Sequence, residues 1–201
     1  LVEGNIHRET YADAHLRARK LSQGLQKMGI GERDVVATMA WNTHRHFEAW
    51  YGITGVGGVY HTLNPRLFPE QLTYIINHAE DKVIMTDLSF VPVLEGIEKD
   101  IPNVKAIIIM TDAAHMPDTS LSNVVCYEDL IDSHNGDFNW VEVDERSPSG
   151  MCYTSGTTGN PKGVCYTHRS NVLHTLASNS ADVMGIRSVD SVMPVVPMFH
   201  A

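Results

Sequence analysis

Residues 154–163 combine hydroxyl side chains, glycines and one lysine in a way that could bind phosphate. The hydroxyl groups belong to Thr154, Ser155, Thr157 and Thr158, the glycines are Gly156, Gly159 and Gly163, and the cation is Lys162. Glycines allow backbone N–H groups to approach a ligand closely, and successive N–H groups in tight turns form a concave anion site. Hydroxyls add donors, and a lysine supplies a compact positive charge. The stretch therefore predicts a loop that holds a polyphosphate, whose oxygens accept hydrogen bonds.

This loop does not follow the Walker A pattern, Gly-x-x-x-x-Gly-Lys-Ser/Thr. Counted from Gly156, Pro161 occupies the position of the second glycine, and Gly163 follows the lysine. Apolar segments at residues 151–154 and 164–167 predict strands on both sides of the loop, whereas a Walker loop leads into a helix. The plain alternative is a flexible surface turn. The combination of glycines, hydroxyls and a Pro-Lys-Gly end favours the phosphate loop over that alternative.

Histidines and acidic residues outside the loop form no metal-binding pattern. His44 and His46 are two positions apart, so they point to different sides of a helix and make a poor metal pair. His61 and His78 have no partner that the sequence identifies, and the acidic pair at residues 80–81 is interpreted as solvated surface. We therefore expect structural or surface roles for these side chains.

The three cysteines, Cys126, Cys152 and Cys165, are sparse and odd in number. Such a set suggests reduced thiols in a cytoplasmic protein rather than a disulfide framework. Cys152 and Cys165 flank the loop and are expected to face each other across two strands, in a structural role.

The composition of the 201-residue chain predicts a folded core and argues against two classes of partner. Hydrophobic residues make up 43% and charged residues 19%, which allows a buried core and is not typical of a disordered chain. The net charge is −9 and no cluster of basic residues occurs, so nucleic-acid binding is not expected. No apolar run approaches the roughly 20 residues of a membrane span.

Helix and strand patterns alternate along most of the chain, which predicts an α/β fold with a mostly parallel sheet flanked by helices. Thr10 is the expected N-cap of the first helix, and Gly29 supplies the left-handed residue that ends it. Helices are predicted from residues 10, 43 and 69 and at 90–99, 127–133 and 168–184, and strands at 34–40, 58–63, 82–86, 104–110, 151–154, 164–167 and 191–196.

A polar stretch, residues 111–149, interrupts this alternation. It predicts a surface connection with one short helix, and a boundary between two parts of the chain. We expect residues 1–149 to form a first α/β sub-domain and residues 150–201 to begin a second one that carries the phosphate loop.

Residues 153–163, YTSGTTGNPKG, resemble the signature of the adenylate-forming superfamily at nearly every position. That superfamily contains acyl-CoA synthetases, the adenylation domains of peptide synthetases, and luciferases. Residues 8–30, 64–87 and 196–201 also resemble family segments, so the likeness covers essentially the whole chain. Within the family the chain looks most similar to medium-chain fatty-acyl-CoA ligases, a branch that includes the 3-methylmercaptopropionate-CoA ligases. The resemblance implies the first part of the large N-terminal domain of an acyl-CoA synthetase, and we expect a fragment without the C-terminal domain.

The resemblance implies an AMP-forming reaction. A carboxylic acid and ATP, with Mg²⁺, would give an acyl-adenylate and pyrophosphate, and coenzyme A would then give the thioester and AMP. The implied contacts to the β- and γ-phosphates come from Thr154, Ser155, Gly156, Thr157, Thr158, Gly159 and Lys162. Thr154 would also help to hold Mg²⁺, and His200 would lie near the acyl carboxylate and the α-phosphate. The implied acid is a short- or medium-chain fatty acid or 3-methylmercaptopropionate, and relatives suggest a homodimer.

Two other functions stay open on the sequence. The first is an adenylating enzyme that passes its acyl group to an acceptor other than coenzyme A, which a carrier domain beyond residue 201 would indicate. The second is a nucleotide-binding module without catalysis, against which an intact lysine near the true C-terminus would count.

Overall fold

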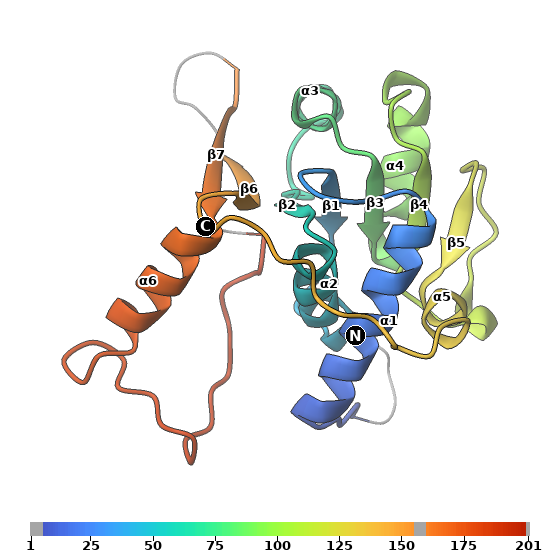
Figure 1. Ribbon diagram of the computed structural model, residues 1–201. Coiled ribbons are helices and arrows are strands. Elements are labelled where there is room, and N and C mark those ends of the chain that lie inside the picture. The colour runs from blue at the N-terminus through green and yellow to red at the C-terminus, as the bar shows by residue number, and fades with distance from the viewer. Residues whose placement is uncertain (1–5, 155–159, 200–201) are drawn as a thin grey trace.

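The computed structural model describes residues 6–154 and 160–199 and arranges them around a seven-stranded sheet (Figure 1). The helices are α1 (Tyr11–Lys27), α2 (His44–Gly55), α3 (Pro69–Ala79), α4 (Val91–Ile97), α5 (Tyr127–Asp132) and α6 (His168–Ser178). The strands are β1 (Val35–Met39), β2 (Val59–Thr62), β3 (Val83–Thr86), β4 (Ala106–Ile109), β5 (Val124–Cys126), β6 (Pro148–Thr154) and β7 (Lys162–Thr167). Short 3₁₀ turns lie at Leu88–Phe90, Glu98–Asp100 and Ala113–His115. The predicted α/β class is confirmed.

The first helix begins and ends where the side-chain chemistry predicts. The hydroxyl of Thr10 accepts a hydrogen bond from the N–H of Asp13 (3.1 Å), and the Asp13 carboxylate accepts one from the N–H of Thr10 (2.9 Å). This reciprocal pair satisfies two N–H groups that a helix start leaves without a partner. Gly29, just past the other end, has a φ of +81°, which glycine adopts without strain.

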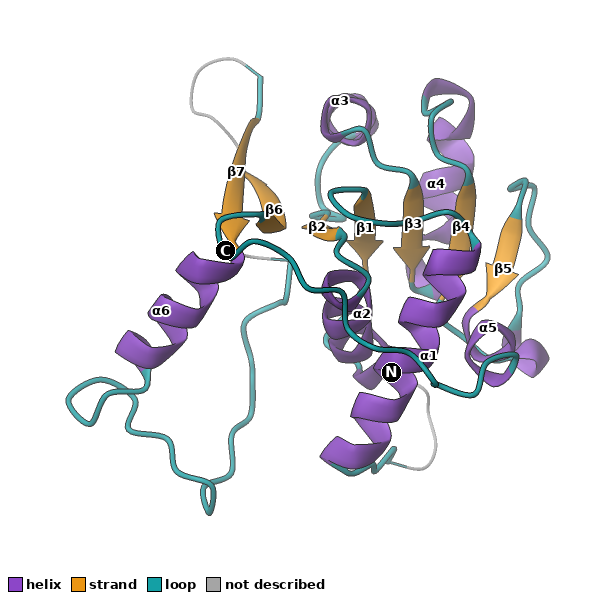
Figure 2. Cartoon of the chain, viewed as in Figure 1, coloured by secondary structure: helices purple, strands orange, loops and turns teal. Residues whose placement is uncertain are grey.

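The strand order is β5-β4-β3-β1-β2-β6-β7. Each neighbouring pair is parallel except β6 and β7, which form an antiparallel hairpin (Figure 2). Because β6 is parallel to β2, the carboxyl ends of these two strands lie on the same edge of the sheet. The pairing of β2 with β6 joins the two predicted sub-domains, residues 1–149 and 150–201, in one sheet. Their division into two sub-domains stays a prediction.

Helices cover both faces of the parallel part of the sheet. On one face, where α1 lies in front of the strands in Figure 1, Leu21 and Leu25 pack with Val36 and Ile108 and with residues of α2 and α5. On the other face, residues of α3 and α4 pack against the intervening strand positions, such as Ile107. Two cores form because successive side chains of a strand point to opposite faces.

Several local predictions differ from the structure. β5 has only three residues, too few to give a periodic pattern in the sequence. α6 ends at Ser178 rather than at residue 184, because the Asn179 side chain accepts a hydrogen bond from the N–H of Ile186 (2.9 Å) and stabilises a turn. The segment at 191–196, whose pattern predicts a strand that Pro194 turns toward an edge or an irregular stretch, is irregular. Pro194 within it has no N–H to give to a sheet.

The register of the hairpin also separates the two cysteines that flank the loop. Cys165 lies opposite Met151, and Cys152 lies opposite Val164. Cys152 and Cys165 therefore point to opposite faces of the hairpin, and the prediction that they face each other is wrong. All three cysteines are free thiols.

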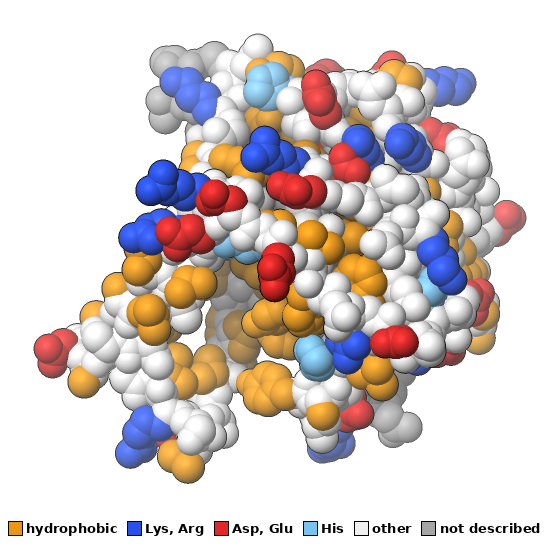
Figure 3. Space-filling view, in the orientation of Figure 1, with side chains coloured by type: hydrophobic (Ala, Val, Ile, Leu, Met, Phe, Trp, Pro, Cys, Tyr) orange, Lys and Arg blue, Asp and Glu red, His pale blue; other side chains and the backbone are white. Residues whose placement is uncertain are grey.

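The segment from α6 to residue 199 forms an arm beside the sheet, with many apolar side chains in solvent. α6 buries no residue, and the side chains of Leu176, Val183 and Met193 are 67%, 67% and 82% exposed. Figure 3 shows hydrophobic side chains around the hollow between this arm and the body of the molecule. Within the described ranges, no helix has the length and apolar character needed to cross a membrane.

Candidate functional site

The β6–β7 hairpin brings together the two described residues at the ends of the predicted phosphate loop. Thr154 is the last residue of β6 and Lys162 the first of β7, and they are direct partners across the strands. Side chains of such a pair share one face, with Cβ atoms about 5 Å apart. Both residues are exposed. The Thr154 and Lys162 side chains therefore project from the same face of the hairpin at the two ends of the predicted loop, and their contact with phosphate stays a prediction.

The other predicted site residues lie outside the described part of the chain. They are Ser155, Gly156, Thr157, Thr158, Gly159 and His200. Thr154 offers one hard oxygen of the kind that Mg²⁺ accepts. Among the residues that the structure describes, His, Cys, Asp and Glu form no group of three or more that could hold a metal ion. A Mg²⁺ ion beside Thr154 would therefore take most of its ligands from phosphate oxygens and water, as Mg²⁺ commonly does in nucleotide sites.

Tyr153, which precedes Thr154, fixes β6 from two sides. Its ring lies across the hairpin against Gly163, where an added Cβ atom would come within 3.1 Å of the ring. Burial and the nearby Asp81 carboxylate raise the pKa of Tyr153 to about 12, so the phenol keeps its proton. The hydroxyl lies 2.6 Å from Nδ1 of His78 on α3, within hydrogen-bond distance. The sequence indicates no partner for His78, and α3 is the element that supplies this contact.

A second histidine without a predicted partner, His61 of β2, forms a buried pair with Asp81. Nδ1 of His61 lies 2.9 Å from the Asp81 carboxylate, and both side chains are fully buried. Burial raises the pKa of Asp81, although His61 opposes that shift. The His61 ring lies 5.2 Å from the Tyr153 ring, measured between centroids. The interpretation of Asp81 as solvated surface is wrong, because the turn between α3 and β3 buries its carboxylate against His61.

The loop after β1 is held by side chains from two other elements. The backbone N–H of Trp41 donates to the Asp87 carboxylate at 2.6 Å, and the carbonyl of Trp41 accepts from Nδ1 of His46 at 3.1 Å. Nε2 of His46 lies 3.0 Å from the hydroxyl of Thr38, which can donate to it. Burial lowers the pKa of His46 to about 4, although the bond to Trp41 opposes that shift. The neutral ring, with one donor and one acceptor nitrogen, matches both partners.

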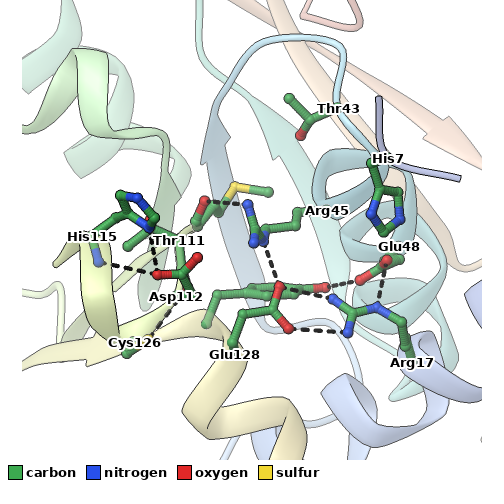
Figure 4. Close-up of polar contacts among 12 residues, drawn as sticks. His7, Arg17, Thr43, Arg45, Glu48, Thr111, Asp112, His115, Cys126 and Glu128 are labelled. Carbon is green, nitrogen blue, oxygen red and sulfur yellow. Dashed lines mark hydrogen bonds and ion pairs between the residues drawn. The ribbon is translucent and has the colours of Figure 1, made fainter. Parts of the chain in front are cut away.

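A larger polar cluster joins α1, α2 and α5 (Figure 4). The buried carboxylate of Glu48 accepts from Nε of Arg17 (2.8 Å) and from the hydroxyl of Tyr127 (2.7 Å). Arg17 also donates twice to Glu128, at 3.0 Å each, and Nε of Arg45 donates to Glu128 at 2.6 Å. Burial raises the pKa of Glu48. For Glu128 burial acts in the same direction, but the hydrogen bonds from Arg17 and Arg45 outweigh it and lower the pKa.

This cluster contains residue types that are common in active sites, but its side chains bind one another and leave neither carboxylate free for a substrate. Its cations and carboxylates bind one another, which is how buried charges are stabilised. The sequence contains no local signal for it, because Glu48 and Tyr127 are 79 residues apart. We interpret the cluster as the polar connection between three helices on one face of the sheet.

A cavity of about 540 Å³ lies between α1, α2 and the segment that contains Trp140. Its walls are mainly apolar and aromatic, with Phe47 and Tyr51 among them, and His168 also lines it. His168 follows the end of β7 opposite to Lys162, so the cavity is separated from the mouth of the loop by the length of that strand. The cavity is therefore not the predicted phosphate site.

The chain is similar to proteins with assigned activities. The whole of it, residues 1–201, matches the family described as AMP-binding enzyme. It is 47% identical to the medium-chain-fatty-acid–CoA ligase of Ectopseudomonas oleovorans over 199 residues, which are 99% of this chain and 36% of that protein. It is 45% identical to the 3-methylmercaptopropionyl-CoA ligase of Ruegeria pomeroyi, over 99% of this chain and 37% of that protein. The chain thus spans little more than a third of these relatives.

Solved structures share the fold. The inhibitor-bound N-terminal domain of FACL13 from Mycobacterium tuberculosis matches with a TM-score of 0.81 and 28% identity, over 96% of this chain and 46% of that one. MatB from Rhodopseudomonas palustris matches with a TM-score of 0.79 and 21% identity, over 96% of this chain and 36% of that one. The predicted placement in the N-terminal domain of an acyl-CoA ligase is confirmed at the level of fold.

Proposed function

The chain belongs to the family of AMP-binding enzymes, and from this premise we propose that the protein is an AMP-forming carboxylate–CoA ligase. In the first half-reaction a carboxylate oxygen attacks the α-phosphorus of ATP and pyrophosphate leaves. In the second half-reaction the thiol of coenzyme A attacks the acyl carbon, its proton is released, and AMP leaves. The observation that carries the proposal is the hydrogen-bonded hairpin with Thr154 directly opposite Lys162 at the ends of a Gly- and Ser/Thr-rich loop.

The charges of the reaction explain why such a loop is useful. A carboxylate must approach a triphosphate, so two anions meet, and negative charge grows on the phosphates as pyrophosphate leaves. Donors and cations that are already in place stabilise this charge without reorganising. We propose that Lys162 and the loop amides hold the β- and γ-phosphates, and that Thr154 contributes one oxygen to Mg²⁺. When bound, Mg²⁺ supplies positive charge to the phosphate oxygens.

For the acid we propose a short- or medium-chain fatty acid or 3-methylmercaptopropionate. Support comes from the names of two relatives, which are 47% and 45% identical to the chain. His200, by resemblance, is proposed to lie near the acid and the α-phosphate. A neutral imidazole there would donate a hydrogen bond to an oxygen of either group.

The test is a product assay on the full-length protein. It is incubated with ATP, Mg²⁺, coenzyme A and a panel of carboxylic acids, and nucleotides and thioesters are quantified. Acid-dependent AMP with an equal amount of acyl-CoA supports the proposal. ADP as the product rejects the mechanism, AMP without thioester indicates another acyl acceptor, and the absence of acid-dependent turnover indicates a non-catalytic module.

The role of Lys162 is tested by Lys162→Ala, with Lys27→Ala on the exposed end of α1 as the matched control. A charge-assisted hydrogen bond contributes about 2 kcal/mol, so kcat/KM for ATP should fall about 30-fold in Lys162→Ala. The free energy of unfolding should change by less than about 0.5 kcal/mol, because the side chain is exposed. Unchanged ATP kinetics would remove Lys162 from the phosphate site.

A further inference from the structure

The side chain of Asn42 makes two hydrogen bonds to the segment that precedes residue 200. Its Nδ2 donates to the carbonyl of Val196 at 2.8 Å, and its Oδ1 accepts from the N–H of Met198 at 2.7 Å. These partners are 154 and 156 residues away along the chain. The orientation of the amide is determined by its partners, because a carbonyl can only accept and an N–H can only donate.

This pair of bonds fixes the direction and register of the segment. One planar amide contacts the C=O of one residue and the N–H of the residue two positions later, as a neighbouring β-strand would. Pro197 stands between them, and its ring restricts the backbone between the two bonded groups. The next residue, Phe199, is buried with 7% of its surface exposed. The chain therefore reaches residue 200 from a backbone that is held on both sides of Pro197.

Asn42 is itself held in place by its neighbours in the sequence. The peptide groups of Trp41 are bound by Asp87 and His46. On the other side, Thr43 caps α2, where its hydroxyl accepts from the N–H of His46 (3.3 Å) and its carbonyl accepts from the N–H of Phe47 (3.0 Å). The loop after β1 thus presents the Asn42 amide from a fixed backbone, which lowers the entropy lost when the segment binds.

We propose that Asn42 is a positioning residue for the adenylation step. Its amide holds residues 196–198 against the loop after β1 and so sets the place of the segment that ends in His200. The proposal rests on the proposed function for its catalytic consequence, but the hydrogen bonds themselves can be tested without activity.

The experiment compares the full-length wild type with Asn42→Ala and Asn42→Leu. The leucine has the same branching and the same number of side-chain heavy atoms as asparagine, although it is larger, and it makes neither hydrogen bond. Asn135→Ala is the matched control, because this asparagine accepts hydrogen bonds from Asp137 and Gln23 and makes none to the segment at 196–198. Hydrogen exchange at the Met198 amide reports on the contact, and acid-dependent ATP–pyrophosphate exchange reports on adenylation.

In both Asn42 variants, exchange at Met198 should accelerate about fivefold or more, as expected for the loss of one hydrogen bond. The kcat for pyrophosphate exchange should fall about 10-fold, while KM for ATP stays within twofold, since the phosphate loop is unaltered. A general loss of structure would instead lower the amount of folded enzyme and speed hydrogen exchange at the amides throughout β1. The control should match the wild type in both assays.

An unchanged rate of hydrogen exchange at the Met198 amide in Asn42→Ala would overturn the proposal. Faster hydrogen exchange at Met198 with an unchanged kcat for pyrophosphate exchange would also overturn it. Recovery of kcat in Asn42→Leu would also overturn it, because packing rather than hydrogen bonding would then be responsible. The absence of acid-dependent ATP–pyrophosphate exchange in the wild type would refute the proposed function. In that case the catalytic role of Asn42 falls with it, and the Met198 measurement still shows whether the contact exists.

Discussion

Replacement of His46 by glutamine should change how the stability of the protein depends on pH. His46 is 1% exposed, and burial lowers its pKa in the folded chain from 6.5 to about 4. Between these values the unfolded chain binds a proton that the folded chain does not. Stability therefore rises with pH through this window, and it falls as the solution is acidified from pH 6.5 toward pH 4.

The size of the effect follows from the two pKa values. One pKa unit corresponds to about 1.4 kcal/mol, so at pH 5 the unfolded state gains about 2 kcal/mol relative to pH 7 from this histidine alone. His46→Gln does not titrate and can keep only one of the bonds to Trp41 and Thr38. It should therefore be about 1 kcal/mol less stable than the wild type at pH 7. At pH 5 this deficit should vanish or reverse.

The assay is urea-induced unfolding of both proteins at pH 7, 6 and 5. The difference between the two proteins isolates His46, because other groups titrate equally in both. His44, whose pKa is also lowered to about 4 by burial and by His7, is one of them. His174→Gln, at an exposed position on α6, is the control and should keep the wild-type pH profile. A deficit for His46→Gln that is the same at pH 7 and pH 5 would refute the argument that His46 is buried as a neutral ring.

Two further substitutions test how β6 is held. Gly150→Ala places a methyl group into the ring of Tyr60 on β2, so the free energy of unfolding should fall by about 2 kcal/mol, and an unchanged urea midpoint would contradict this packing. Tyr153→Phe removes the hydrogen bond to His78 but keeps the ring contact with Gly163. It should cost about 1 kcal/mol of stability and raise KM for ATP, and a variant that matches the wild type in both measurements would show that the bond does not hold the loop.

The elements that carry local signals were predictable from the sequence. Thr10 is an N-cap as predicted, the helix predicted from residue 43 begins with Thr43 as its N-cap, and Gly29 ends α1 in the left-handed conformation. Apolar runs predict the strands on both sides of the predicted phosphate loop, and the hairpin register places Thr154 opposite Lys162. Each of these features depends on residues that are close in sequence, where the periodicity and the chemistry of caps and turns act directly.

Features that depend on residues far apart in sequence could not be predicted in the same way. Asp81 follows another acidic residue, which is typical of a solvated surface, and only the packing of α3 brings it to His61. β5 is too short for a pattern, and its three residues are held as a strand by pairing with β4. In these cases the tertiary contacts, rather than local preference, determine the structure.

The loop after β1 shows why these long-range contacts matter for the proposed chemistry. Two side chains from other elements bind it, since Asp87 binds the N–H of Trp41 and His46 binds its carbonyl, and Asn42 of the loop itself binds the segment at 196–198. Protonation of His46 requires its buried ring to carry a charge, which burial disfavours. The free energy that holds His46 in this loop is therefore expected to be smaller at pH 5 than at pH 7. His46 fixes the carbonyl of Trp41, and the next residue, Asn42, is the one that bonds to the segment at 196–198.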